Sequence, residues 1–106
     1  MKTYNKLVRD KIPDICLANG DVPETSILDE ASFRAELKKK LCEEAAEFVA
    51  DGNLEELADV LELIKANAEA NGSSIEEIER MRAQKAKERG GFSKRIFLIS
   101  TNKSPN

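Results

Sequence analysis

The sequence predicts an all-α protein, folded as an antiparallel helical bundle with short extended segments near its two ends. Ala, Leu, Glu and Lys dominate the composition and all favour helix, while aromatic residues make up only 5% and Trp is absent. Apolar residues recur at helical spacing in two long segments that a short turn joins. A chain of 106 residues can bury one modest core. We therefore expect a single domain over residues 1–99 and a disordered tail over residues 100–106.

The N-terminal part is expected to hold one brief helix. Residues 3–9 are compatible with an extended strand, and "KIPDICLANG" follows them. Asp10 can cap the helix, Pro13 fits its first turn, where a missing N–H is harmless, and Asn19 with Gly20 ends it. The turn-forming residues of "GDVPETS" then predict a loop.

Two long helices follow, over residues 32–50 and 54–71, with "DGN" closing the first and opening the second. In the next segment Ser74 and Glu77 have capping-box spacing, and Gly90 and Gly91 end the helix that they begin. The apolar run "RIFLI" at residues 95–99 resembles a strand but is too short to assign.

Charge and composition exclude several classes of function. A net charge of -3 does not give the basic footprint of nucleic-acid binding, so no nucleic-acid partner is expected. No apolar run reaches the ~20 residues that span a bilayer, and no signal peptide is recognisable. We expect a cytoplasmic protein without a membrane partner. Cys16 and Cys42 lack metal-site spacing and are expected to pack between helices. Because the chain has no His, it cannot use imidazole catalysis or His-ligated zinc.

Each long helix carries acids where apolar residues are expected. On the first, Leu37, Leu41 and neighbouring apolar residues lie within about 60° of Glu44, and Glu47 lies about 60° to the other side. On the second, Val60, Leu63 and Asn67 lie within about 40° of Glu56, with Asp59 about 60° away. A further apolar surface on the second helix is broad enough to predict burial in a bundle or at a subunit interface; it comprises Leu54, Leu57, Leu61 and Ile64.

The short turn should fold these acids toward one another, so Glu44, Glu47, Glu56 and Asp59 would share one seam. Buried carboxylates that repel one another need a cation among them. Since only oxygen ligands are on offer, Mg²⁺ or Mn²⁺ is the cation expected. The alternative is a plain helical bundle whose acids pair with Lys40, Lys65 or Arg82.

Such a metal favours phosphoanhydride hydrolysis, because it polarises phosphoryl oxygens and acidifies a bound water. Basic residues near both ends of the chain could bind the phosphates, although each cluster alone also fits a solvated face. The candidates for substrate binding are Lys6, Arg9, Lys11, Lys85, Arg89, Lys94 and Arg95.

The acidic blocks "EEAAE" at 43–47 and "ELAD" at 56–59 resemble the signature of the MazG-like all-α nucleoside triphosphate pyrophosphatase superfamily. With "YNKLVRDKIPDI" and "RGGFSKRIFLI", nearly all of residues 4–99 is similar to its small phosphoribosyl-ATP pyrophosphohydrolase-like branch. The resemblance implies that Glu44, Glu47, Glu56 and Asp59 hold Mg²⁺. It further implies release of a nucleoside monophosphate and pyrophosphate, by dimers or tetramers with the active site near an interface.

One feature departs from the resemblance. Only eight residues separate Glu47 from Glu56, which is shorter than the usual spacing, so nucleotide preference does not carry over. Nothing in the sequence argues specifically for phosphoribosyl-ATP as substrate. A second hypothesis is a non-catalytic helical module for oligomerisation or nucleotide sensing.

Overall fold

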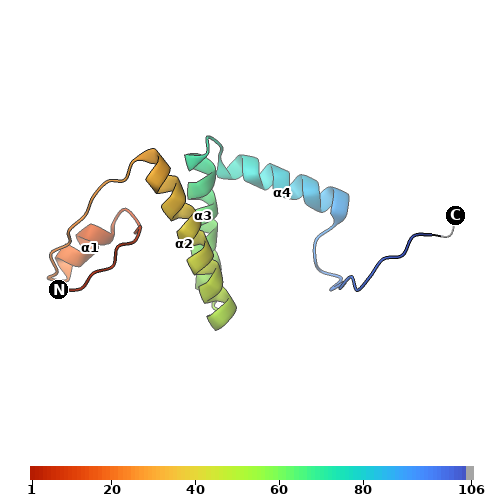
Figure 1. The fold of residues 1–106 in the computed structure, drawn as a ribbon, viewed down its shortest axis with the longest axis horizontal. Helices are drawn as coiled ribbons and strands as arrows, with labels where there is room; N and C mark the ends of the chain where they lie inside the picture. Colours follow the sequence, from red (N-terminus) through yellow and green to blue (C-terminus); the bar gives the residue numbers. More distant parts are fainter. Residues whose placement is uncertain (105–106) are drawn as a thin grey trace. The chain divides into compact units, whose positions relative to one another are not determined.

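A computed structural model describes residues 1–104 and shows four α-helices and no strand over that range (Figure 1). The helices are α1 (Ile12–Ala18), α2 (Glu30–Asp51), α3 (Leu54–Ala70) and α4 (Ile75–Arg89). The prediction of an all-α fold is confirmed.

The short helix α1 begins one residue later than a cap at Asp10 would require. Lys11 takes the N-cap position and makes no side-chain capping hydrogen bond, so the prediction for Asp10 is wrong. Pro13 does lie in the first turn, where its missing N–H costs nothing. Asn19 is the C-cap residue, as its position before Gly20 predicts.

The long helix α2 begins two residues before the predicted start, because a better cap lies upstream. Asp29 Oδ1 accepts a hydrogen bond from the Ser32 backbone N–H at 2.8 Å. That hydrogen bond stabilises the ionised carboxylate and lowers the pKa of Asp29. Ser32, the residue predicted to begin the helix, therefore lies within its first turn and donates the capping hydrogen bond to Asp29.

The turn between α2 and α3 depends on Gly52. Its φ of 71° lies in the left-handed region, and its N–H donates to the Phe48 carbonyl at 2.8 Å. Asn53 is extended and leads directly into α3. Such a short link makes the two helices run antiparallel, and they pack side by side (Figure 1).

The core of the described chain lies between these two helices, in the half far from the turn. Leu37 of α2 and Leu63 and Ala68 of α3 are its buried apolar residues. Asn67 joins the same contact, because its Nδ2 donates to the Leu63 carbonyl at 2.7 Å and to the Leu37 carbonyl at 3.5 Å. One amide thus links α3 to α2 beside the apolar contact.

The chain divides into two compact units, Met1–Ile75 and Glu76–Asn106, which we describe separately. The first contains α1, α2 and α3. The second contains α4 from Glu76 onward; the helix begins at Ile75, directly after Ser74. The prediction of one domain over residues 1–99 stays a prediction.

The segment after α4 does not form the strand that its apolar sequence suggests. Residues 96–99 are exposed, with no regular secondary structure. A strand needs a partner for its backbone hydrogen bonds, and residues 1–104 contain none. Residues 100–104 likewise have no regular structure, and residues 105 and 106 of the predicted tail lie outside the described residues.

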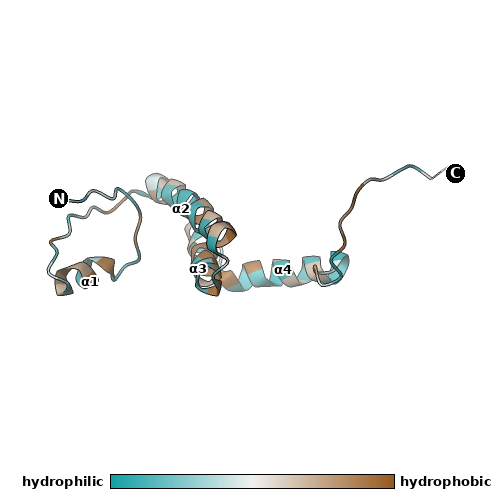
Figure 2. Ribbon diagram, turned by 90° about the horizontal axis from the view of Figure 1, so that it is seen from below, coloured by the Kyte–Doolittle hydropathy of each residue, from teal (hydrophilic) through white to brown (hydrophobic). Residues whose placement is uncertain are grey.

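Large apolar side chains remain exposed along α3. Leu54, Leu57 and Leu61 are 79%, 43% and 57% exposed, on the surface predicted to meet a further helix or subunit. Figure 2 shows hydrophobic residues along α3 and in the segment that follows α4. None of the described helices is both long enough and apolar enough to cross a membrane.

We expect Leu63→Ala to lower the free energy of unfolding by about 2–4 kcal/mol, because it leaves a cavity in a core of very few residues. Urea denaturation followed by helical circular dichroism measures the change. Leu98→Ala removes the same atoms from a side chain that is 74% exposed and should cost less than about 0.5 kcal/mol. Equal losses for the two variants would contradict the assigned core.

Candidate acidic metal site

The four acids predicted to share a seam do lie near one another at the turn end of the α2–α3 pair. Glu44 interacts electrostatically with Glu47 and Asp59, and Glu56 with Glu44 and Glu47. Two of these acids come from α2 and two from α3. The antiparallel turn therefore brings them together, as the helical geometry predicts.

Glu44 lies in the packed seam and Glu47 at its margin. The Glu44 side chain is 14% exposed, whereas Glu47 is exposed. Burial raises the pKa of Glu44, and the carboxylates of Glu47 and Asp59 add to this effect. Lys40, one turn earlier, acts in the opposite direction, with its Nζ 3.8 Å from Glu44 Oε1. One of the ion pairs expected for a plain helical bundle, that of Lys40 with Glu44, is thus present.

Glu56 is the most perturbed acid of the seam. Its Oε2 is buried and has no hydrogen-bond partner among the described residues. Burial, followed by the close carboxylate of Asp51, raises the pKa of Glu56 to about 7. Two ionised carboxylates cannot hydrogen-bond each other, whereas protonation of one supplies the missing donor. The protonated Glu56 can therefore donate a hydrogen bond to the Asp51 carboxylate.

Asp51 is a fifth acid that the sequence analysis missed. It was assigned to the turn, but α2 continues through this residue. Seven residues after Glu44, it returns to within about 20° of the same direction on the helix. The signal was therefore present in the spacing of Glu44, Glu47 and Asp51.

Asp59 has a cationic partner from the N-terminal segment. Arg9 Nη2 donates to Asp59 Oδ1 at 2.7 Å, across 50 positions of sequence. Arg9 is one of the residues predicted to bind phosphate. This ion pair places Arg9 beside the acidic seam. No local sequence pattern predicts the contact.

The other predicted phosphate-binding residues have different surroundings. Lys6 lies over the Tyr4 ring, 5.8 Å from its centroid, and Lys11 occupies the N-cap position of α1. The remaining four belong to unit 76–106, where all are exposed: Lys85, Arg89, Lys94 and Arg95. Their role toward a nucleotide stays a prediction. Of the alternative partners, Arg82 binds Glu79 at 2.6 Å and Lys65 is exposed.

The seam fits a hard divalent cation in donor chemistry, but its side chains do not form a closed cage. The five acids offer only oxygen ligands, and Glu56 Oε2 is a buried oxygen without a partner. Over residues 1–104, no three Asp, Glu or Cys side chains are grouped closely enough to hold a metal ion. Asp59 is instead paired with Arg9. A closed cage would require these side chains to rearrange.

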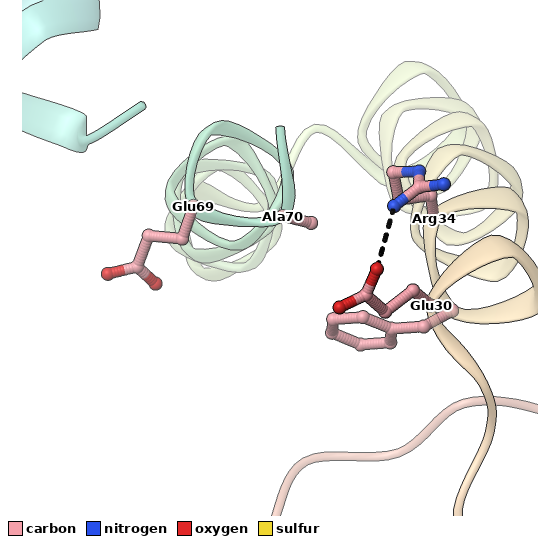
Figure 3. A pocket seen from close by; sticks show the side chains of 5 residues that line it. Glu30, Arg34, Glu69 and Ala70 are labelled. Carbon is pink, nitrogen blue, oxygen red and sulfur yellow. Dashed lines mark ion pairs between the residues drawn. The ribbon is translucent and has the colours of Figure 1, made fainter. Parts of the chain in front are cut away.

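A pocket of about 330 Å³ lies at the opposite end of the helix pair. It is lined by Glu30, Phe33, Arg34, Glu69 and Ala70. Figure 3 shows Ala70 of α3 directed toward α2, Glu69 directed away from it, and the 3.9 Å ion pair of Arg34 with Glu30. None of the predicted site residues lines this pocket, so it is separate from the acidic seam.

Comparisons with protein-family models, with curated proteins and with solved structures found no match for this chain. The resemblance to MazG-like pyrophosphatases thus stays a hypothesis that depends on the motifs alone.

The raised pKa of Glu56 predicts a specific dependence of stability on pH. The folded state holds this proton up to a pH of about 7, whereas the unfolded chain releases it near 4.5. Stability from this group is therefore complete below pH 4.5 and is lost as the pH rises to about 7. We expect the urea midpoint of the wild type to fall between pH 5 and pH 8, and Glu56→Gln to reduce that fall.

Glu55→Gln, at the adjacent exposed position, should keep the wild-type pH dependence. Identical slopes for Glu56→Gln and the wild type would show that Glu56 does not titrate in this range.

Proposed function

We propose that this chain is a Mg²⁺-dependent nucleotide pyrophosphohydrolase of the cytoplasm. It would cleave the bond between the α and β phosphates of a nucleoside triphosphate or related nucleotide, releasing a monophosphate and pyrophosphate. The observation that carries the proposal is the cluster of carboxylates from α2 and α3, in which a buried oxygen of Glu56 lacks a partner. Mn²⁺ is the second cation that suits these ligands.

The residues of the seam divide into two roles. Glu44, Glu47, Glu56 and Asp59 would hold the metal. A bound Mg²⁺ supplies polarisation of a phosphoryl oxygen and a water of lowered pKa. Asp51 lies outside the predicted ligand set and interacts with Glu56, and its carboxylate would be the group that accepts a proton from the attacking water.

The charges of the nucleotide require cationic groups as well. Arg9 already lies at the seam, 2.7 Å from Asp59, and its planar guanidinium suits a phosphate. Residues Lys6, Lys11, Lys85, Arg89, Lys94 and Arg95 remain further candidates. Phosphoribosyl-ATP is an alternative substrate that the motifs suggest, and a panel of nucleotides would decide between them.

A homo-oligomer, either dimer or tetramer, is part of the proposal. The buried core between α2 and α3 is small, and Leu54, Leu57 and Leu61 leave an apolar stripe of α3 uncovered. This stripe lies about 100–160° round the helix from Glu56, on the side away from Asp59. A second copy packed on it would leave the Asp59 side of the seam accessible.

A second candidate function is a non-catalytic helical module for oligomerisation or nucleotide sensing. The same exposed stripe favours it, as do the ion pairs of Glu44 with Lys40 and Asp59 with Arg9. These pairs neutralise part of the seam without a metal.

Glu44→Gln and Asp59→Asn are each expected to reduce Mg²⁺-dependent pyrophosphate release by about 100-fold or more, because each removes a charged ligand. A panel of ordinary and modified nucleotides, assayed for released pyrophosphate, measures the effect. Glu69→Gln removes the same charge from the far end of α3 and should leave the rate unchanged. Absence of turnover with every nucleotide in both Mg²⁺ and Mn²⁺ would reject the enzymatic proposal.

Thermal melts of the wild type and Glu44→Leu separate the two candidate functions. If the seam binds metal, Mg²⁺ raises the Tm of the wild type and not that of Glu44→Leu. If the chain is a non-catalytic module, Glu44→Leu raises the Tm with or without Mg²⁺, because it removes a charge held in a packed seam.

A further inference from the structure

One side-chain pair fastens the N-terminal segment to α3. Arg9 Nη2 and Asp59 Oδ1 are 2.7 Å apart, which is the length of a charge-assisted hydrogen bond. Both side chains are nevertheless accessible, at 57% and 41% exposed. An accessible ion pair is weak, so another partner for either group can replace it.

The position of Arg9 matters because of what surrounds Asp59. Asp59 belongs to the seam in which burial, together with Glu47 and Asp59, raises the pKa of Glu44, and in which Glu47 and Glu44 add to the raised pKa of Glu56. The other cation at the seam, Lys40, lies 3.8 Å from Glu44, so Arg9 makes the shorter contact. The acidic seam therefore already contains a cation that the chain itself supplies.

A divalent cation at this seam would compete with Arg9. Mg²⁺ needs carboxylate oxygens at about 2.1 Å, and a guanidinium held on the same carboxylate would face it at close range. We propose that Arg9 is a resident counter-ion of Asp59, displaced when a divalent cation binds, and that its displacement releases residues 1–10 from α3. The inference rests on the proposed metal-dependent function and adds a conformational step to it.

Displacement also gives Arg9 a second use. Its guanidinium stays charged at any physiological pH and offers a planar fork to phosphate oxygens. Once released from Asp59, Arg9 would be free to bind the phosphates of a nucleotide held by the seam. Arg9 would thus neutralise Asp59 when no metal is bound, and bind the nucleotide when the metal is bound.

The chain carries its own reporter of this step. Tyr4 is the single tyrosine and Trp is absent, so intrinsic fluorescence comes from the N-terminal segment alone. Tyr4 lies five residues from Arg9, and Lys2 Nζ is 5.3 Å from its ring centroid. No helix contains residues 1–10, so the anisotropy of Tyr4 fluorescence depends on whether the segment is held.

The experiment uses the full chain as the wild type, as Arg9→Gln and as the matched control Arg34→Gln. Arg34 pairs with Glu30 at 3.9 Å at the other end of the helix pair, so its substitution removes the same charge away from the seam. Mg²⁺ is titrated while the anisotropy of Tyr4 is recorded. Mn²⁺ affinity is measured separately by electron paramagnetic resonance of the free ion.

We expect Mg²⁺ to lower the anisotropy in the wild type and in Arg34→Gln. Arg9→Gln should start at the low value and show no change on adding Mg²⁺. Without the competing guanidinium, Arg9→Gln should also bind Mn²⁺ up to about fivefold more tightly than the wild type.

Two results would overturn the inference, and they are distinguishable. Equal Mn²⁺ affinity in the wild type and Arg9→Gln, with constant anisotropy at saturating Mg²⁺, would show that Arg9 does not compete; the proposed function would then stand. Absence of Mn²⁺ binding in all three proteins would overturn both the inference and the proposed function. Mn²⁺ binding by Arg9→Gln alone would support the inference in its strongest form.

Discussion

The contact between α2 and α3 is the constraint on which the rest of the first unit depends. The half of this contact far from the turn is apolar and holds Leu37, Leu63 and Ala68. The half near the turn is acidic and holds Glu44, Glu56 and their neighbours. The apolar half supplies the burial that keeps the acids together, and the acids oppose it by mutual repulsion. The apolar core that stabilises the pair and the candidate site therefore lie at opposite ends of one helix–helix interface.

Much of this arrangement is readable from sequence, because it depends on local periodicity. The spacing of apolar residues predicts both long helices, and the angular positions of Glu44 and Glu56 predict that they face the partner helix. Asp51 was missed because its neighbours Gly52 and Asn53 signal a turn, although the helix extends to include it. A one-residue error at the end of α2 was enough to hide one member of the cluster.

The remaining differences concern interactions that no local pattern encodes. The pair of Arg9 and Asp59 joins residues 50 positions apart, and its existence depends on how the N-terminal segment lies against α3. The apolar run at residues 95–99 has the composition of a strand, yet a strand exists only where another backbone pairs with it. Neither outcome follows from the residues concerned without their partners. For the same reason, the resemblance to pyrophosphatases predicts which acids converge but says nothing of the cations that the chain places among them.

The Gly52–Asn53 turn has a consequence for how this protein can vary. Only two residues join the helices, so the length of the chain fixes the distance between the acidic blocks of α2 and α3. Each residue removed from α3 ahead of Glu56 would turn its acids by about 100° relative to the helix start, enough to bring Leu57 and Leu61 toward α2 in their place, and each residue added would turn the acids as far in the other direction. Substitution at Asn53, whose side chain makes no capping hydrogen bond, disturbs much less. The joint is therefore tolerant of composition and intolerant of insertions and deletions.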